Sequence, residues 1–501
     1  MPKLSLDNIS RLLWALVLVT LPVTSFRYVP FMGDGTYVRP LAIYPLALLW
    51  PVLLIRLKQG KIARPWPGAL TVVLAFALAA LAATVFGGLL APLPLRGADY
   101  FDRAIRALLT VGIGLAFFVA AIWMNQSEAD LKFSVKWLLA GLALDLAWSA
   151  AQFIGLNTGY RQQLIKIQNL FSVRGLVQNK RASGFAFEPS WLAGQLAALY
   201  LPWLFAALLS GYRIFTDTEY ATRNTHYVSR VAYSVFRMVG RWIEPVLLLG
   251  SLACLLITYS RSGLATVVLA ALFTFVVAGR ETASAFWGWV RAGFNVQRWT
   301  SRRAAIKAAG SRVLLAGLAV AVLAGATVFL ADKGYIAALF KSQKEDLFSY
   351  AVDAYLGPRL AYSAAAMDTF QESPWLGVGL GASGFTMYNH MPDWALAGVP
   401  EIAQQLSPDS RLYPNPKDLY ARLLAETGLL GFALFVAFYL ALLADALGLL
   451  HGRSAAARWL AMAALFTFAA VVLQGFSQDS FAMPEMWVNL GMLAGAAAVL
   501  K

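Results

Sequence analysis

The sequence contains few of the residues that build disulfide frameworks or transition-metal sites. Its 501 residues include a single cysteine, Cys254, so an intramolecular disulfide and a thiolate metal cluster are both excluded. The three histidines, His226, His390 and His451, lie far apart and do not suggest a metal centre. Charged residues make up only 13% of the chain, which argues against a soluble domain of any size. We therefore expect no metal and no other cofactor.

Long apolar runs dominate the sequence instead. Hydrophobic residues make up 59% of it, and its mean hydropathy is +0.62. Runs long enough to cross about 30 Å of hydrocarbon recur along the chain, and they predict an all-α, polytopic membrane protein with about twelve transmembrane helices. The predicted spans are 10–26, 41–56, 67–86, 105–124, 137–156, 190–210, 243–259, 263–279, 313–331, 427–447, 457–475 and 485–500.

The predicted spans divide the chain into three parts. Residues 1–331 hold the first nine predicted helices, and residues 419–501 hold the last three. Between them, residues 332–418 form one long loop, in which the periodic apolar stretches YIAALF and LAYSAAAMDTF predict short helices. The glycines of SPWLGVGLGASGF in this loop do not form a dinucleotide-binding fingerprint, because no strand precedes them.

Basic residues in the short loops predict the orientation of the chain. The second, sixth and eighth connections carry an excess of lysine and arginine. These connections are therefore predicted to be cytoplasmic, together with both termini. The fifth connection and the long loop 332–418 then lie on the outer face.

The formal net charge of +15 raises the question of a nucleic-acid partner. The segment SAFWGWVRAGFNVQRWTSRR mixes tryptophans and arginines, as an RNA-binding surface does. Aromatic and basic residues next to a membrane span fit an interfacial helix on anionic lipid better. We therefore predict contact with membrane lipids and no nucleic-acid partner.

The turn TYSRSG places Arg261 between two predicted spans, at the outer face. An arginine in hydrocarbon costs roughly 2.5–3.5 kcal/mol on insertion scales, which suggests that it has a function. The small residues Ser260, Ser262 and Gly263 leave room for the backbone to turn and for a bulky anion to approach. The alternative is that Arg261 only extends to the outer lipid headgroups.

The fifth connection departs from the positive-inside trend, since it carries Arg181 and four other basic residues on the outer face. This excess suggests an anionic ligand, although long loops also escape the rule. Glu188 follows in the string FEPSW, with Pro189 in the first turn of the next helix. Its carboxylate either serves the site or simply favours the positive end of that helix.

A third arginine, Arg359, lies in the long outer loop. Three separate segments thus bring Arg181, Arg261 and Arg359 to one side of the membrane. Arginine binds phosphate oxygens bidentately and stays protonated, and no paired aspartates suited to magnesium accompany these residues. The pattern predicts a metal-independent clamp for a diphosphate.

Three motifs in order, TYSRSG, GPRLAYSAAAMDTFQESPWLGVGLGASGF and LYARLLAETGLLGF, resemble the bacterial O-antigen ligase and O-antigen polymerase superfamily. The resemblance covers residues 180–500, including a long periplasmic loop. It implies an inverting, metal-independent glycosyltransferase of the bacterial inner membrane, whose active site faces the periplasm and takes glycan from undecaprenyl diphosphate. The family arginines that bind the diphosphate correspond to Arg261 and Arg359, with Arg181 a weaker match.

The sequence departs from the ligases at one position. They usually carry a His-Asn pair nine residues before the Glu of the LAETG-like motif, whereas this chain has Lys417 and Asp418 there, followed by Tyr420 near the outer surface. We rank the candidates for the catalytic base as Glu188, then His390, then a neutral Lys417. A charged Lys417 would bind the diphosphate instead.

The FEPSW feature resembles polysaccharide polymerases more than ligases. We therefore predict an O-antigen or exopolysaccharide polymerase, with an O-antigen ligase that transfers glycan to lipid A core as the second hypothesis. A lipid-linked oligosaccharide transporter is the competing class, but it would place ionisable residues near the bilayer midplane. The implied partners are an undecaprenyl diphosphate-linked oligosaccharide, an acceptor glycan or lipid A core, and membrane lipids.

Overall fold

The computed structural model describes residues 5–28, 38–62, 65–173, 181–215, 227–294, 356–410, 413–452 and 454–500. Within these ranges the chain forms helices and only isolated β-bridges, which confirms the all-α prediction for them. The predicted span 313–331 and the stretch YIAALF lie outside the described residues.

Seven helices in the described ranges are long and apolar enough to cross a membrane, which identifies a multi-pass membrane protein. They are α3 (Gly68–Leu89), α4 (Tyr100–Met124), α5 (Glu128–Asn157), the continuous α7, η1 and α8 (Pro189–Gln195, Leu196–Tyr200 and Leu201–Ser210), the Arg261–Gly279 part of α10 (Arg261–Phe294), α18 (Leu419–Leu450) and α19 (Ala455–Gly475).

The remaining helices are shorter or less apolar. Those at other predicted spans are α1 (Leu6–Thr20), α2 (Ile43–Lys58), α9 (Tyr227–Ile257) and α20 (Pro484–Leu500). The others are α6 (Arg161–Phe171), α14 (Gly357–Glu372), α15 (Ser383–Met387), α16 (Asp393–Gly398) and α17 (Pro400–Leu406). A total of twelve transmembrane helices stays a prediction.

Several predicted boundaries are wrong, for local reasons. The first span was predicted to end six residues too late, at 26 instead of Thr20, because Pro22 follows the end of α1 and proline cannot continue a helix. The helix α18 begins eight residues earlier than predicted, at Leu419, since the carboxylate of Asp418 caps its first turn. Polar caps extend helices beyond the apolar run that periodicity detects.

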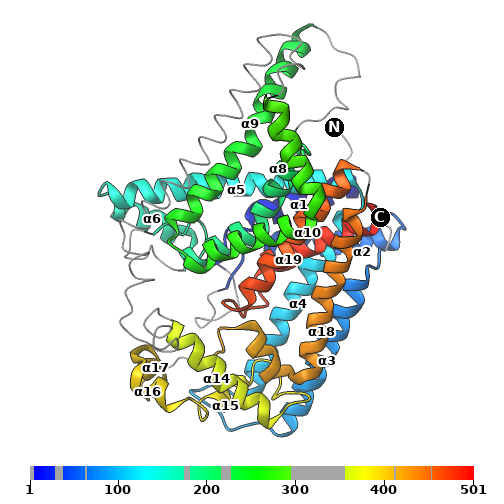
Figure 1. The fold of residues 1–501 in the computed structure, drawn as a ribbon. Coiled ribbons are helices and arrows are strands. Elements are labelled where there is room, and N and C mark those ends of the chain that lie inside the picture. Colours follow the sequence, from blue (N-terminus) through cyan, green and yellow to red (C-terminus); the bar gives the residue numbers. More distant parts are fainter. Residues whose placement is uncertain are drawn as a thin grey trace.

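The helices α3 and α18 run side by side, as Figure 1 shows, and α19 packs against α18, α10 and α8. The apolar windows of α19 and of Pro189–Ser210 are each 78% buried, against 33% for that of α18. These two segments therefore form the interior of the bundle, and side chains at the ends of both contribute to the site described below.

The helix α18 is broken at Gly428, whose φ of 61° and ψ of −166° are not helical. The loop 374–379 is inserted at the break and makes four backbone hydrogen bonds that the helix has lost. These are Val378 N to Ala425 O, Gly379 N to Glu426 O, Leu429 N to Pro374 O and Leu430 N to Trp375 O, at 2.8–3.3 Å. The glycine-rich loop thus fixes the first two turns of α18 relative to the rest of it.

A second irregularity lies in the predicted sixth span. Pro202 has no amide hydrogen to donate to the carbonyl of Ala198, and the turn around it widens into the π-helix η1. The side chain of Asn489 donates to that carbonyl at 2.8 Å. A side chain from α20 thereby satisfies a backbone group that would otherwise be unpaired inside the bundle.

The helices α14–α17 form a separate group of short helices beside α18 (Figure 1). Its apolar core joins Tyr362, Ala365 and Met387 to Ala421 and Ala425 of α18. This packing places the first turn of α14, which carries Arg359, near the beginning of α18.

Candidate functional site

One pocket gathers side chains from four separated segments of the chain. Its empty volume is ≈ 390 Å³, which includes open solvent. It brings together two residues selected from the sequence, Glu188 and Arg359. The lining residues are Glu188, Ser190, Trp191, Gly194, Ser262, Gly263, Thr266, Arg359, Gln474, Ser477 and Gln478.

Arg359 lies in the first turn of α14, directly after Pro358. Its Nη1 donates to the carbonyl oxygens of Ser477, at 2.8 Å, and of Lys417, at 3.3 Å. Within the described part of the chain these two carbonyls are its hydrogen-bond partners, and it forms no ion pair. Neutral groups therefore hold the guanidinium, and Nη2 and Nε can still bind an anion bidentately.

Glu188 precedes the first turn of α7, with an extended backbone, and Pro189 occupies the first helical position. Its carboxylate accepts a hydrogen bond from the hydroxyl of Ser190. The side chain therefore lies at the N-terminal end of the helix. The pocket thus contains a carboxylate and a guanidinium with hydroxyl and amide side chains between them.

The segment before Glu188 is fixed by two fully buried side chains of α5, Asp145 and Gln152. The carboxylate of Asp145 accepts from the amide of Phe185 at 2.8 Å. Gln152 accepts from the amide of Gly184 and donates to its carbonyl, both at 2.9 Å. These bonds hold the backbone that leads to Glu188 in one conformation.

Arg181 supports the turn before α10. Its Nε donates to the carbonyl of Thr258 at 2.8 Å, and its Nη2 donates to that of Tyr259 at 3.4 Å. Tyr259 has a φ of 52°, a left-handed conformation that non-glycine residues rarely adopt. Arg181 therefore stabilises this turn through two of its nitrogens.

Arg261 is the exposed first residue of α10. It does not line the pocket itself, but the next two residues, Ser262 and Gly263, do. The hydroxyl of Ser260 accepts from the amide of Gly263 at 3.2 Å, as a helix N-cap does. Ser260 thus shapes the helix end, and Arg261 lies beside the pocket rather than in it.

The structure places Lys417, Asp418 and Tyr420 in supporting positions. The ammonium of Lys417 pairs with Glu401 at 3.3 Å, in the short-helix group. The carboxylate of Asp418 accepts from the amides of Tyr420 and Ala421, at 2.8 and 2.9 Å. The hydroxyl of Tyr420 donates to the carbonyl of Val472 at 2.6 Å.

His390 is not brought to the pocket. Its Nε2 lies 3.1 Å from the carboxylate of Glu372, at the last residue of α14. Arg359 is in the first turn of that helix. At about 1.5 Å of rise per residue, about 20 Å separate the two positions along the axis.

Residues 246–436 match a family model described as O-antigen ligase. The resemblance to the O-antigen ligase and polymerase superfamily is confirmed. The matched part is less than half of the chain, and it contains Arg261, Arg359 and Lys417. No curated protein matches the chain. The match indicates an O-antigen ligase-like membrane enzyme, with lipid-linked glycans as the class of substrate.

The pocket joins the residues that match this family model to residues outside the match. Ser262, Thr266 and Arg359 lie inside the matched range, whereas Glu188 and the end of α19 do not. Sequence reasoning missed Gln474, Ser477 and Gln478 at that end. The polar string QGFSQDS between two apolar spans could have indicated these residues, because polar residues within the membrane are costly and often functional.

Sequence reasoning also missed a buried polar network that includes Asp479, the residue after Gln478 of the pocket. Arg422 donates to the carboxylate of Glu426 at 2.9 Å and to the carbonyl oxygen of Asp479 at 2.6 Å. Ser383 donates to the other oxygen of Glu426 at 2.8 Å. Burial raises the pKa of the Asp479 carboxyl, and the positive charge of Arg422 opposes this shift.

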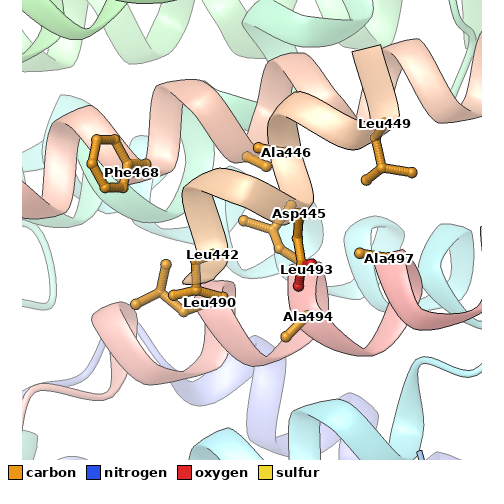
Figure 2. A pocket seen from close by; sticks show the side chains of 10 residues that line it. Leu442, Asp445, Ala446, Leu449, Phe468, Leu490, Leu493, Ala494 and Ala497 are labelled. Carbon is orange, nitrogen blue, oxygen red and sulfur yellow. The ribbon is translucent and has the colours of Figure 1, made fainter. Parts of the chain in front are cut away.

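A second pocket lies between α18, α19 and α20 and is lined almost wholly by apolar side chains, with Asp445 among them (Figure 2). Asp445 is near the opposite end of α18 from Asp418, about 40 Å away along the helix. This pocket is therefore remote from Glu188 and Arg359. In the described part of the chain no group of three or more His, Cys, Asp or Glu residues is placed to hold a metal ion.

Proposed function

We propose that the protein is a glycosyltransferase of the bacterial inner membrane. It transfers glycan from an undecaprenyl diphosphate-linked donor to an acceptor sugar at the periplasmic face. The observation that carries the proposal is the shared pocket of Arg359 and Glu188. In it, a guanidinium with no carboxylate partner among the described residues accompanies a carboxylate at a helix N-terminus.

Arg359 is assigned to the leaving diphosphate. Its Nη2 and Nε form a planar pair of donors that matches two oxygens of a phosphate. As the sugar departs, negative charge increases on the diphosphate, and a fixed cation stabilises that charge more in the transition state than in the ground state. Arg261, beside the pocket, adds positive charge, and Arg181 holds the turn that carries Arg261.

Glu188 is assigned to the acceptor. An acceptor hydroxyl attacks the anomeric carbon from the face opposite the diphosphate and forms the new glycosidic bond. The bond from that carbon to the diphosphate oxygen breaks, and its electron pair leaves with the diphosphate. Glu188 takes the hydroxyl proton as general base. This single displacement inverts the configuration at the anomeric carbon.

Polymerisation is the preferred form of the reaction. The position that carries histidine in the ligases is Lys417, and its ammonium is directed to Glu401 rather than to the pocket. A base therefore has to come from elsewhere, and Glu188 is the carboxylate that lines the pocket. Transfer to lipid A core is the second candidate, because the matching family model is described as O-antigen ligase.

The test uses purified full-length protein with undecaprenyl diphosphate-linked repeat units, with and without lipid A core. A ladder of products without core supports polymerase activity, and a single transfer that requires core supports ligase activity. Absence of transfer, with movement of the lipid-linked glycan across vesicles that contain the protein, would instead identify a transporter.

A further inference from the structure

The tryptophan of the FEPSW string lines the same pocket as Glu188 and Arg359. Glu188 is the N-cap residue of α7, and Trp191 is the third residue after it. The amide of Trp191 donates to the carbonyl of Glu188 at 3.0 Å, which closes the first turn. Side chains at these two positions lie on the same side of a helix, as they do in a capping box. The indole therefore neighbours the carboxylate that is assigned to the acceptor.

The indole of Trp191 is held by a second aromatic ring. Phe187 packs against it with 5.0 Å between the ring centroids and an interplanar angle of 38°. The amide of Phe187 donates to the buried hydroxyl of Thr24 at 2.9 Å, which fixes the backbone that carries this second ring. Trp191 itself is partly buried and packs against the hydrophobic core. A ring fixed in this way loses little freedom when a ligand stacks on it.

The indole N–H of Trp191 distinguishes it from the tryptophans of the core. Within the described ranges, the fully buried tryptophans each donate from Nε1 to an oxygen at 2.6–3.2 Å; these are Trp14, Trp203, Trp459 and Trp487. Nε1 of Trp191 has no such partner among the described residues. Because a tryptophan N–H usually finds a partner inside a protein, that of Trp191 is suited to a ligand.

The rest of the pocket lining supplies hydroxyl and amide side chains. Ser262 and Thr266 come from α10, and Gln478 comes from the turn after α19. Gly263 lets α10 approach α7 closely, since a Cβ on it would lie 2.5 Å from the Cβ of Ala193. The polar groups match the hydroxyls of a sugar, and the negative face of an indole matches the C–H bonds of a sugar ring.

We propose that Trp191 binds the sugar ring of the acceptor, which stacks on the indole and places its attacking hydroxyl at Glu188. A general base lies within hydrogen-bond distance of the proton that it removes, so the acceptor ring has to occupy the space beside Glu188. Among the described residues, Trp191 is the one aromatic side chain that lines this pocket. The inference rests on the proposed glycosyltransferase function and adds an acceptor subsite to it.

The test varies the acceptor independently of the donor, on full-length protein in nanodiscs. The donor is an undecaprenyl diphosphate-linked repeat unit whose acceptor hydroxyl is methylated, so that it cannot accept glycan. The acceptors are lipid A core and an alkyl glycoside of the repeat unit, which has no diphosphate and cannot donate. The KM for the acceptor, kcat and the affinity for undecaprenyl diphosphate are measured on the same preparations.

Trp191→Leu keeps an apolar side chain but removes the aromatic face and the N–H. The KM for the acceptor should rise about tenfold, while kcat stays within about threefold, because the indole binds the acceptor equally in the ground state and the transition state. The affinity for undecaprenyl diphosphate should stay within about twofold of the wild type, since the diphosphate is assigned to Arg359.

Two other variants complete the comparison. Trp191→Phe keeps an aromatic face but loses the N–H, so it should raise the KM for the acceptor by only about threefold. This variant decides the test if Trp191→Leu does not fold. Trp66→Leu is the matched control, because Trp66 is exposed and donates to Thr71 outside the pocket. It should leave all three quantities unchanged.

An unchanged KM for the acceptor in the Trp191 variants overturns the inference, while transfer by the wild type leaves the proposed function standing. If Trp191→Leu weakens the binding of undecaprenyl diphosphate as much as it raises the KM for the acceptor, the indole contacts the donor, and the inference is again overturned. If the wild type transfers glycan to neither acceptor, the inference and the proposed function both fall.

Discussion

Arg359 donates a hydrogen bond to the carbonyl oxygen of Ser477 at 2.8 Å, across 118 residues of sequence. The bond connects the short-helix group to the end of α19, an interior helix of the bundle. Because the acceptor is neutral, it fixes the guanidinium without cancelling its charge. This combination of fixed position and available charge is what an anion site requires.

The first prediction concerns the planar guanidinium of Arg359. Arg359→Lys keeps the charge but loses the parallel donors, so the affinity for undecaprenyl diphosphate should fall by about tenfold or more. Equilibrium binding to the purified variant measures this. Arg161→Lys, in α6 and outside the pocket, is the matched control and should bind normally. If Arg359→Lys and the wild type bind undecaprenyl diphosphate with equal affinity, Arg359 does not bind the diphosphate bidentately.

The second prediction concerns the break in α18. A Cβ on Gly428 would collide with the backbone of Trp375, and its φ of 61° is unfavourable for alanine. Gly428→Ala should therefore destabilise the protein by about 2 kcal/mol or more, seen as a lower Tm. Gly112→Ala, in open space within α4, is the control and should be neutral or stabilising. Similar Tm values for the two variants would contradict the role of the inserted loop.

The third prediction concerns pH. Burial raises the pKa of Asp479, so between the ordinary value of about 3.9 and the raised value the folded protein keeps a proton that the unfolded chain has lost. Stability from this group is therefore present at low pH and is lost as pH rises through that window. Asp479→Asn does not titrate.

The Tm of the wild type relative to Asp479→Asn should accordingly fall as pH rises from about 4, and then level off. Thermal scans at several pH values check this. The same scans of Asp409→Asn, a change at an exposed position, show the effect of a charge change alone. A difference between wild type and Asp479→Asn that grows with pH would contradict the sign of the shift.

The fold was largely predictable because membrane spans are encoded in long apolar runs, which periodicity and length detect. Helices occur at eleven of the twelve predicted segments, and the remaining one, 313–331, lies outside the described residues. The errors fall at helix ends such as Pro22 and Asp418, where a single proline or cap decides the boundary. Composition averaged over a window does not resolve such residues.

The site was predictable only in part. Glu188 stands out because a charged residue at the end of an apolar span is unusual, and Arg359 stands out through the GPRLAY motif of the long loop. The supporting position of Lys417 could not be foreseen, because its side-chain direction follows from a left-handed backbone that contacts far away in sequence impose. Asp479 was missed for the same reason, since Arg422, which donates to its carbonyl oxygen, comes from the first turn of α18.

The fourth prediction concerns orientation. The basic second connection is predicted to be cytoplasmic, and the short-helix group periplasmic. In cells that express Gln59→Cys or Gln404→Cys, both at exposed positions, an impermeant thiol reagent should label only the second. The native Cys254 is buried and provides the background. Labelling of position 59 but not of position 404 would reverse the orientation and place the pocket on the cytoplasmic side.

The central claim is that Glu188 and Arg359 serve one reaction in one pocket, and the most direct measurement is donor affinity and transfer rate on the same Glu188→Gln protein. Glutamine keeps the size of the side chain but removes the base, so transfer should slow by about 100-fold or more. Binding of undecaprenyl diphosphate should stay within about twofold of the wild type, because the diphosphate is held by Arg359. His390→Ala should retain substantial activity, because His390 pairs with Glu372 at the opposite end of α14 from Arg359. Normal transfer by Glu188→Gln together with an inactive His390→Ala would contradict the account and assign the base to His390.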